Sequence, residues 1–531
     1  MTDERTSFLP DDTKATAEDW RAQVEAGLAG ASFDRKLVSR LEGGLQIRPL
    51  YTRADLPSAD PGGYPGFAPL TRGSSPLPPD AKASERRGAD PVGAIARQGH
   101  LATPLDRAIA DAAASGETLL VSTEAWHDAG ATAPQELGLA LSTGLAYLRA
   151  LEAAGLPPER AEARLVFELQ VGVDVFVEIA KLRAARRLWC RILEASGVAS
   201  PAMQLEARTA WRTLTARDPW TNLLRGTIGA FAARAGGVSS VEVRPFDEAV
   251  GEPDELGRRM SRNTKLVLDE ESHLDGVADP AGGSFFLERL TEDLAEAGWK
   301  ELQEIEKQGG IVAALRAGFV QARLEDAAAR RREEVATRRL PITGVSEFPN
   351  LRELPLERPS REVNQAHAPQ GGESIRPLLF ERIAAGFERL RDRSDAHQAA
   401  TGSRPKVFLA SFGSASQHLA RSTFVDNLFA AGGVESLTTD GYPDAAAAAR
   451  SFSQSGAKLA VICAADAAWD ELVGPASKAL RDAGAERILL AGRPGEKEAS
   501  LRALGVDGFV HLGMNALDLL ESTLSLLQVA P

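Results

Sequence analysis

The chain is poor in cysteine, and this scarcity limits the kinds of site that it can form. Of its 531 residues only Cys190 and Cys463 are cysteines, and they lie far apart in the sequence. Two thiols cannot make a disulfide framework or, by themselves, a zinc cluster. We therefore expect both to be small buried apolar residues, and we expect no metal site.

Long apolar runs and basic clusters are missing as well. No stretch is long and apolar enough to cross a bilayer, so no membrane association is expected. Residues 1–16 are acidic and polar and lack the apolar centre of a secretory signal, which favours a cytoplasmic protein. The formal net charge of -13, without a basic stripe, argues against nucleic acid as a partner.

What the chain does have is enough apolar sequence for two or three domains. Residues 17–43 carry apolar side chains at mostly helical spacing and predict one helix, which ends at Gly43 and Gly44. Residues 56–79 are rich in proline and glycine, so no regular element is expected there. We assign residues 1–99 to an amino-terminal helix and a segment that wraps over a surface.

Residues 100–339 show the pattern of parallel βα units. Four short apolar runs alternate with helical patterns, and more helix is expected at 254–272 and 286–338. The four runs are residues 118–122, 165–169, 203–207 and 240–243. A complete (β/α)₈ barrel needs twice that number of strands. The pattern therefore predicts a partial or degenerate TIM-type barrel that is truncated.

The carboxyl-terminal part has two sections. Residues 340–404 contain several prolines and many charges and predict a linker, with a helix from 375 to about 390 before the last domain. Residues 405–531 alternate strands with alanine-rich helices. The strands are expected at 407–411, 434–437, 459–463, 488–491 and 509–512. This order predicts a flavodoxin-like, doubly wound domain whose ligand site would lie at the strand exits. The fold class is therefore α/β.

Seven segments, in one order along residues 48–284, resemble the methylmalonyl-CoA mutase family. The segments are Arg48-Pro49-Leu50-Tyr51-Thr52, Ala129-Gly130-Ala131 with Gln135-Glu136-Leu137, Glu178-Ile179-Ala180-Lys181-Leu182-Arg183-Ala184-Ala185-Arg186 with Leu188-Trp189, Arg217-Asp218-Pro219-Trp220, Arg262-Asn263-Thr264, Glu270-Glu271-Ser272-His273 and Asp279-Pro280-Ala281-Gly282-Gly283-Ser284. The resemblance implies a substrate barrel threaded by coenzyme A, a linker and a cobalamin domain. In active relatives, adenosylcobalamin supplies a radical for carbon-skeleton rearrangement.

The cobalamin-binding motif of the family, Asp-x-His-x-x-Gly, is degenerate in this chain. Its three positions are occupied by Ala415, Gln417 and Ala420, so the cobalt ligand, its carboxylate partner and the small glycine are all lost. His418 is a weak candidate for a shifted ligand, but it lacks the aspartate that would orient it. A surface role for this histidine is favoured, and we expect no cofactor on this chain.

The substrate-facing positions have changed too. The resemblance places a catalytic histidine four residues before Ala129, where this chain has Ala125. His127 is a weak replacement, expected one step further out on a strand, and a structural role is favoured for it. Arg208 stands at the position of a substrate-contacting glutamine; an arginine there could bind a carboxylate, but an interface or surface charge is favoured. Both of the family's tyrosine motifs are absent, and residues 74–79 follow Arg72-Gly73 instead.

Two strand exits in the last domain also depart from the family. They are Cys463-Ala464-Ala465-Asp466 and Ala491-Gly492-Arg493-Pro494, in place of small turns that would leave a slot for the nucleotide tail. Residues 270–273 hold two glutamates and a histidine, but neighbouring carboxylates on a helix point to different sides. These residues are interpreted as structural.

Together these losses predict a subunit that retains the fold of the family but not its catalytic activity. The hypothesis is a small, non-catalytic subunit of a heterodimeric acyl-CoA mutase, whose partner is the catalytic large subunit carrying adenosylcobalamin. One alternative is an active acyl-CoA isomerase with an atypical site. Another is a regulatory protein that binds acyl-CoA without turning it over.

Overall fold

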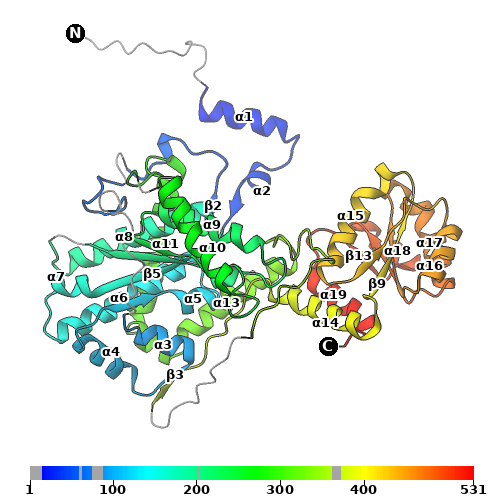
Figure 1. Ribbon diagram of the computed structural model, residues 1–531. Helices are drawn as coiled ribbons and strands as arrows, with labels where there is room; N and C mark the ends of the chain where they lie inside the picture. The colour runs from blue at the N-terminus through cyan, green and yellow to red at the C-terminus, as the bar shows by residue number, and fades with distance from the viewer. Residues whose placement is uncertain are drawn as a thin grey trace.

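The computed structural model describes residues 15–58, 62–73, 88–199, 202–274, 276–360 and 372–530. It is a mixed α/β structure of two lobes joined by a narrower waist, and helix α1 (Ala17–Gly27) stands apart from both (Figure 1). Within the described residues, none of the helices has both the length and the apolar character needed to cross a membrane.

The amino-terminal arm contains two short helices instead of the single helix predicted for 17–43. Helix α1 is followed by α2 (Phe33–Leu37) and by an antiparallel pair of strands, β1 (Ser39–Arg40) and β2 (Gln46–Ile47). The prediction was wrong because Ala29 and Gly30 adopt positive φ angles of 49° and 87°, which the α-helix does not allow.

The large lobe contains the predicted four-stranded parallel sheet. Its strands are β4 (Leu119–Ser122), β5 (Leu165–Val171), β6 (Gln204–Thr209) and β7 (Ser240–Glu242), paired in sequence order. The prediction of four parallel strands is confirmed. In the described part of the chain these strands form an open sheet, not a closed barrel.

One face of this sheet is apolar and the other is polar. Val121, Phe167 and Leu205 lie side by side in the sheet, as do Leu169 and Ala207, and all five are buried in the main core. Helices cover this face and the ends of the sheet (Figure 1). They are α3 (Pro91–Gln98), α4 (Leu105–Ala114), α5 (Glu124–Asp128), α6 (Ala133–Ala153), α7 (Pro158–Ala161), α8 (Val175–Ala195), α9 (Thr221–Ala235), α10 (Glu255–Leu266) and α11 (Phe285–Lys307).

Helix α11 packs against α6 and α8 as an outer layer. After α11 the chain forms α12 (Ile311–Arg316) and α13 (Phe319–Ala336), so the helical stretch predicted for 286–338 is divided in three. The first division falls at Gly309 and Gly310 and the second at Gly318, all three with positive φ. The helix predicted for 254–272 is α10, continued by one π-helical turn, η5 (Val267–Glu271).

The waist contains regular secondary structure. The helix predicted from 375 to about 390 is instead α14 (Ala385–Thr401), and a two-residue strand, β8 (Glu373–Ser374), pairs with β3 (His100–Leu101) before it. Pro377 disfavours helix at the start of this stretch because proline has no N–H to donate. Phe387 of α14 and Val345 belong to the core of the small lobe, so the predicted linker is partly built into that lobe.

The small lobe has the predicted flavodoxin-like topology. Its five parallel strands follow the order β10-β9-β11-β12-β13, which is the doubly wound order 2-1-3-4-5. The strands are β9 (Lys406–Ser411), β10 (Glu435–Leu437), β11 (Leu459–Cys463), β12 (Arg487–Ala491) and β13 (Gly508–Val510). The helices are α15 (Ala415–Ala431), α16 (Ala445–Ser455), α17 (Trp469–Asp482), α18 (Glu498–Ala503) and α19 (Ala516–Leu526). Two separate apolar clusters line the two faces of the sheet.

The described part of the proline- and glycine-rich segment, residues 62–73, lies against the large lobe. The Arg186 guanidinium of α8 donates hydrogen bonds to the carbonyl oxygens of Leu70 and Thr71, at 3.3 and 3.0 Å. Residues 74–79, where the family's tyrosine motif is replaced, lie outside the described residues. The domain boundaries at 99, 339 and 404 stay predictions.

Candidate functional site

The carboxyl ends of the large-lobe strands bring together most of the polar residues that the sequence singled out. This edge is where parallel βα folds place their active sites. Helix α5 directly follows β4, and a short 3₁₀ turn, η4 (Trp211–Thr213), follows β6 at the same edge. Ala125 and His127 both lie on α5, not on a strand as we predicted.

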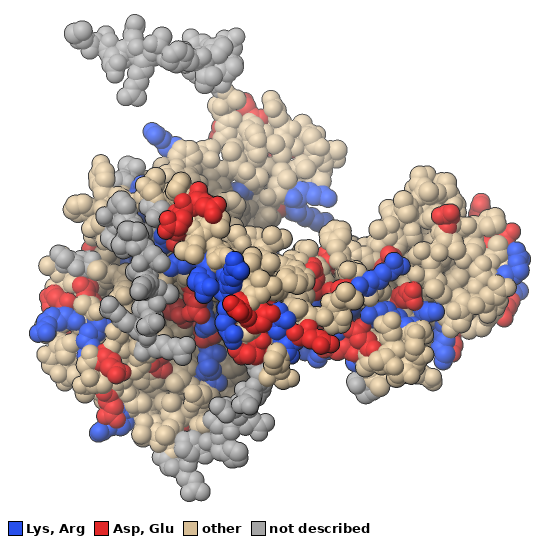
Figure 2. Space-filling model, viewed as in Figure 1, with Lys and Arg blue, Asp and Glu red and all other residues tan. Residues whose placement is uncertain are grey.

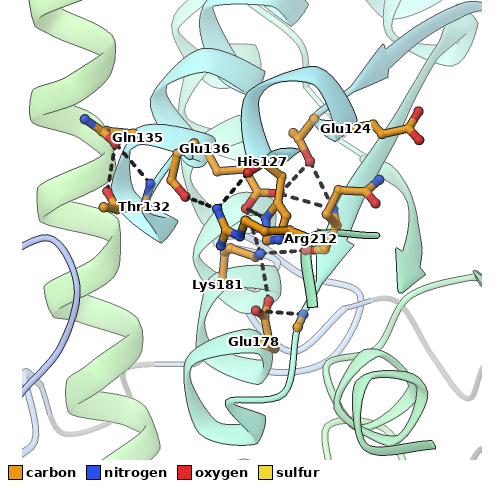
Figure 3. Close-up of polar contacts among 12 residues, drawn as sticks. Glu124, His127, Thr132, Gln135, Glu136, Glu178, Lys181 and Arg212 are labelled. Carbon is orange, nitrogen blue, oxygen red and sulfur yellow. Dashed lines mark hydrogen bonds and ion pairs between the residues drawn. The ribbon is translucent and has the colours of Figure 1, made fainter. Parts of the chain in front are cut away.

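Ala125 offers no group for catalysis, and His127 is enclosed. Ala125 is 1% exposed and His127 is 2% exposed. The His127 Nδ1 atom lies 3.2 Å from Glu136 Oε2, and the carbonyl of His127 accepts a hydrogen bond from Arg212 at 2.7 Å (Figure 3). The first contact holds the imidazole and the second holds its backbone, and the burial of the ring leaves it no open approach.

A fully buried ion cluster lies next to His127. Lys181 Nζ is 2.9 Å from Glu136 Oε2 and 2.7 Å from Glu178 Oε2, and it donates to the carbonyl of Gln170 at 2.6 Å. Glu136 comes from α6, and Glu178 and Lys181 come from the first turns of α8 (Figure 3). Burial of one cation between two carboxylates is tolerable only because the groups pair with one another.

The pKa values follow from this packing. Burial, with Arg212 nearby, lowers the pKa of His127 to about 3, so the imidazole is neutral at pH 7. Burial alone would raise the pKa of Glu136, but Lys181 and hydrogen bonds from His127 and Thr123 outweigh it and hold that pKa well below its usual range. Burial raises the pKa of Glu178 in spite of Lys181. A neutral, enclosed histidine beside a fixed carboxylate is a structural arrangement.

Arg208 lies on the polar face of the sheet and is bound by neighbouring carboxylates. Its guanidinium is 3.4 Å from Glu124 and 3.0 Å from Glu242. Glu124 also pairs with Arg97 at 2.7 Å and with Arg244. The arginine that could have bound a substrate carboxylate is therefore part of a charge network across the sheet.

In the small lobe, the start of α15 carries the three positions that the family resemblance assigns to the cobalamin-binding motif. Ala415, Gln417 and Ala420 are exposed on the first turns of α15. The Gln417 side-chain oxygen accepts a hydrogen bond of 2.8 Å from the Ser414 backbone N–H, so this residue caps its own helix. An amide used in this way does not replace a metal-bound imidazole.

His418 is buried, although we expected it at the surface. It is 3% exposed, and its Nε2 atom lies 3.2 Å from the carbonyl oxygen of Asp440. His418 directly follows Gln417 in the helix. Its side chain therefore points in a different direction from the exposed positions, inward toward the loop before α16. Helical geometry thus keeps His418 from taking over the ligand position.

The strand exits beside this loop are filled by an aromatic ring and an ion pair. Trp469, 2% exposed, lies so close to Gly492 that a Cβ atom added there would be 2.5 Å from the indole. Arg421 donates to the carbonyl of Ala464, pairs with Asp466 at 2.7 Å and lies 5.5 Å from the Trp469 ring. These residues do not fit a nucleotide tail inserted between the third and fourth strand exits.

Sequence reasoning missed Trp469, Arg421, Lys181 and Glu136 as members of these sites. An aromatic residue six positions after the third strand was a usable signal for Trp469. Lys181 and Glu136 lie inside family segments, but only their burial shows that they neutralise each other. Among the described residues, no group of three or more histidine, cysteine or acidic side chains could hold a metal ion.

Comparison with known proteins agrees with this picture of a retained fold. Residues 105–377 match the family model described as methylmalonyl-CoA mutase. The chain is 39% identical to the methylmalonyl-CoA mutase small subunit of Streptomyces virginiae, with 99% of this chain and 100% of the relative covered. The small subunit from Propionibacterium freudenreichii subsp. shermanii is 36% identical over 83% of this chain and 69% of the relative.

The large subunit of the same Propionibacterium is also similar, but over less of the chain. It is 38% identical over 242 residues, which cover 45% of this chain and 33% of that subunit. The alignment with the Streptomyces small subunit runs over 633 positions, more than the 531 residues present here, so part of that relative has no counterpart. This agrees with the four-stranded sheet. The coverage and identity together place this chain in the methylmalonyl-CoA mutase family.

Proposed function

We propose that this chain is the non-catalytic small subunit of a heterodimeric, adenosylcobalamin-dependent acyl-CoA mutase of the methylmalonyl-CoA type, acting in the cytoplasm. The proposal rests on the residues found at the carboxyl ends of the strands in the two parallel sheets. At one edge His127 is buried against Glu136, and at the other Trp469 is buried and Gln417 caps its own helix. Adenosylcobalamin would then reside on the large subunit only.

The amino-terminal arm supports a role in assembly. No residue of α1 is buried, and the helix stands apart from the body of the molecule (Figure 1). The arm is held together by contacts such as the edge-to-face pair of Trp20 and Phe33, 6.0 Å apart. An isolated helix of this length is marginal in water, so a surface on another chain would stabilise it.

The exposed side of α9 supports the same role. Trp220, Leu224, Ile228 and Phe231 recur at helical spacing, and their exposed fractions are 51%, 64%, 38% and 38%. The outward side of a helix that covers a sheet is normally polar. A row of four large apolar side chains there is typical of a protein interface.

Co-expression with a large subunit from the same genome tests the proposal. Size-exclusion chromatography should give a stoichiometric complex, and the absorbance of the separated subunits should place cobalamin on the large chain only. A double substitution, Leu224→Glu with Ile228→Glu, should reduce complex formation while the thermal stability of the isolated chain stays unchanged. Arg191→Glu, on the exposed side of α8, is the matched control. A chain that stays apart and carries cobalamin itself would contradict the proposal.

A further inference from the structure

A cavity of about 570 Å³ lies in the waist between the two lobes. Its walls come from the end of α5, from η4, from α13 and from the segment 378–386 that leads into α14. The volume is within the range of roughly 300–1,000 Å³ that small-molecule sites occupy. The cavity is therefore large enough for an organic ligand.

Most of the cavity wall is apolar. The apolar part is formed by large side chains of three elements, Trp211, Leu324, Val335, Leu378, Phe380 and Ile383. The small lobe contributes Leu517, and the loop between β9 and α15 contributes no lining residue. The cavity is thus separate from the degenerate cobalamin positions.

Two arginines converge at one wall of this cavity. Arg212 donates to the carbonyl oxygen of Ala131 at 3.0 Å, and Arg331 of α13 reaches the same oxygen at 3.5 Å. Both guanidinium groups line the cavity. Two cations that share one acceptor repel each other unless negative charge lies close by.

Only one of these two arginines has a direct ion pair with a carboxylate in the described part of the chain. Arg331 Nε donates to Glu42 at 2.6 Å, whereas Arg212 has no carboxylate within ion-pair distance in the described part of the chain. Burial, together with the neighbouring Arg331, lowers the pKa of Arg212 to about 10. The guanidinium of Arg212 therefore has Glu42, Glu136 and Asp128 as its nearest negative charges but no direct ion pair among the described residues.

The rim of the cavity adds to the positive charge. Arg332 and Arg389 share a single carboxylate, Glu381, at 3.6 and 3.1 Å, and Arg382 pairs with Glu388 at 2.7 Å. Charges of both signs mix along the waist on the face shown in Figure 2. Five arginines line the cavity against Asp128, Glu325 and Glu381, and two of them, Arg331 and Arg382, pair with Glu42 and Glu388, which do not line it.

We propose that this cavity binds a small amphipathic organic anion, a carboxylate that carries an apolar chain. The carboxylate lies against Arg212 and Arg331, where it forms the direct ion pair that Arg212 lacks among the described residues. The chain lies along the segment 378–383 and the apolar side of α13. This binding function is additional to the subunit role, and it holds whether or not the chain pairs with a large subunit.

Isothermal titration calorimetry on the full chain tests the site, with sodium octanoate and inorganic phosphate as probes. Octanoate should bind saturably at one site, and phosphate should bind much more weakly because it lacks the apolar part. Arg212→Met should weaken octanoate binding about tenfold or more, since a hydrogen bond to a charged group is lost. Arg332→Met, at the exposed rim, should weaken it severalfold without affecting folding.

The matched control is Arg330→Met, an exposed arginine on the same helix that does not line the cavity. It should leave the octanoate affinity unchanged. The absence of saturable octanoate binding to the wild-type chain would overturn the proposal. Equal binding of phosphate and octanoate would overturn the amphipathic ligand, and equal losses in Arg332→Met and Arg330→Met would show a general charge effect and overturn the site.

Discussion

The two parallel sheets of this chain differ in the residues that fill the edge at the carboxyl ends of their strands. In the large lobe, the edge contains ionisable groups: Lys181 pairs with Glu136 and Glu178 in a buried cluster, and the neutral His127 lies against Glu136. In the small lobe, Trp469 fills the space next to Gly492 at the edge. The edge of the large-lobe sheet is thus filled by paired ionisable groups, and the edge of the small-lobe sheet by a packed aromatic ring.

This difference has consequences for stability. A buried ion cluster depends on every member, because removal of one partner leaves an uncompensated charge in a low-dielectric interior. A packed aromatic ring contributes through area and contacts, so its loss leaves a cavity and no stranded charge. Substitutions at the two edges should therefore differ in size and in their dependence on pH.

The largest effect is expected from Lys181→Met, which leaves Glu136 and Glu178 buried without their cation. The free energy of unfolding should fall by about 3–5 kcal/mol, the usual result of breaking a buried ion pair. Urea denaturation at pH 7 measures this loss. Arg191→Met, exposed on the same helix, should change stability by less than about 0.5 kcal/mol. A loss below about 1 kcal/mol for Lys181→Met would show that water reaches the cluster and solvates the two carboxylates.

Trp469→Ala should produce the next largest effect. Removal of the buried indole should cost about 3 kcal/mol, at the lower end for an aromatic-to-alanine change, because Arg421 can partly occupy the space. The same denaturation experiment, followed by near-ultraviolet circular dichroism, measures it. Leu512→Ala, exposed in the same lobe, is the control. If Trp469→Ala were as stable as that control, the edge would not be closed by packing.

The pH dependence should separate the two edges more sharply. The folded chain holds the pKa of His127 at about 3, so only the unfolded chain takes up this proton between about pH 3 and the ordinary value near 6.5. Stability should therefore fall as the pH falls through this window, by about 1.4 kcal/mol per pH unit from this residue alone.

His127→Gln should remove that contribution. Asp128, whose pKa burial raises to about 6, acts in the opposite direction, because its stability contribution is lost as the pH rises through about 4 to 6. Asp128 is present in both proteins, so the difference in pH dependence between wild type and His127→Gln gives the contribution of the imidazole alone. Thermal unfolding at pH 5 and pH 6.5 measures this difference, and identical slopes would show that His127 takes up its proton in the folded state.

The smallest effect is expected from Arg421→Met. Its ion pair with Asp466 is mostly exposed, and such pairs contribute about 0–1 kcal/mol. The methionine can still cover part of the Trp469 ring, so the free energy of unfolding should change by less than about 1 kcal/mol. A loss above about 2 kcal/mol would show that the ion pair, and not the indole, closes the small-lobe edge.

Much of the fold could be predicted from the sequence because the signals for it are local. Alternating apolar runs and helical patterns located all nine strands of the two main sheets and the doubly wound order of the small lobe. The errors arose where a local signal was weak. The turn at Ala29 has no strong helix-breaking pair, and the start of α14 depends on packing of Phe387 in the small lobe.

The sequence by itself determined which residues stand at the positions that the family resemblance assigns to ligands, because Ala125, Ala415, Gln417 and Ala420 follow from residue identity alone. Only the tertiary structure decided what replaced them. Lys181 lies 45 positions from Glu136, and Trp469 and Gly492 lie on different loops, so their contacts arise only when helices and strands pack. Burial then sets the charge state of each group, since desolvation depends on surroundings that no local pattern contains.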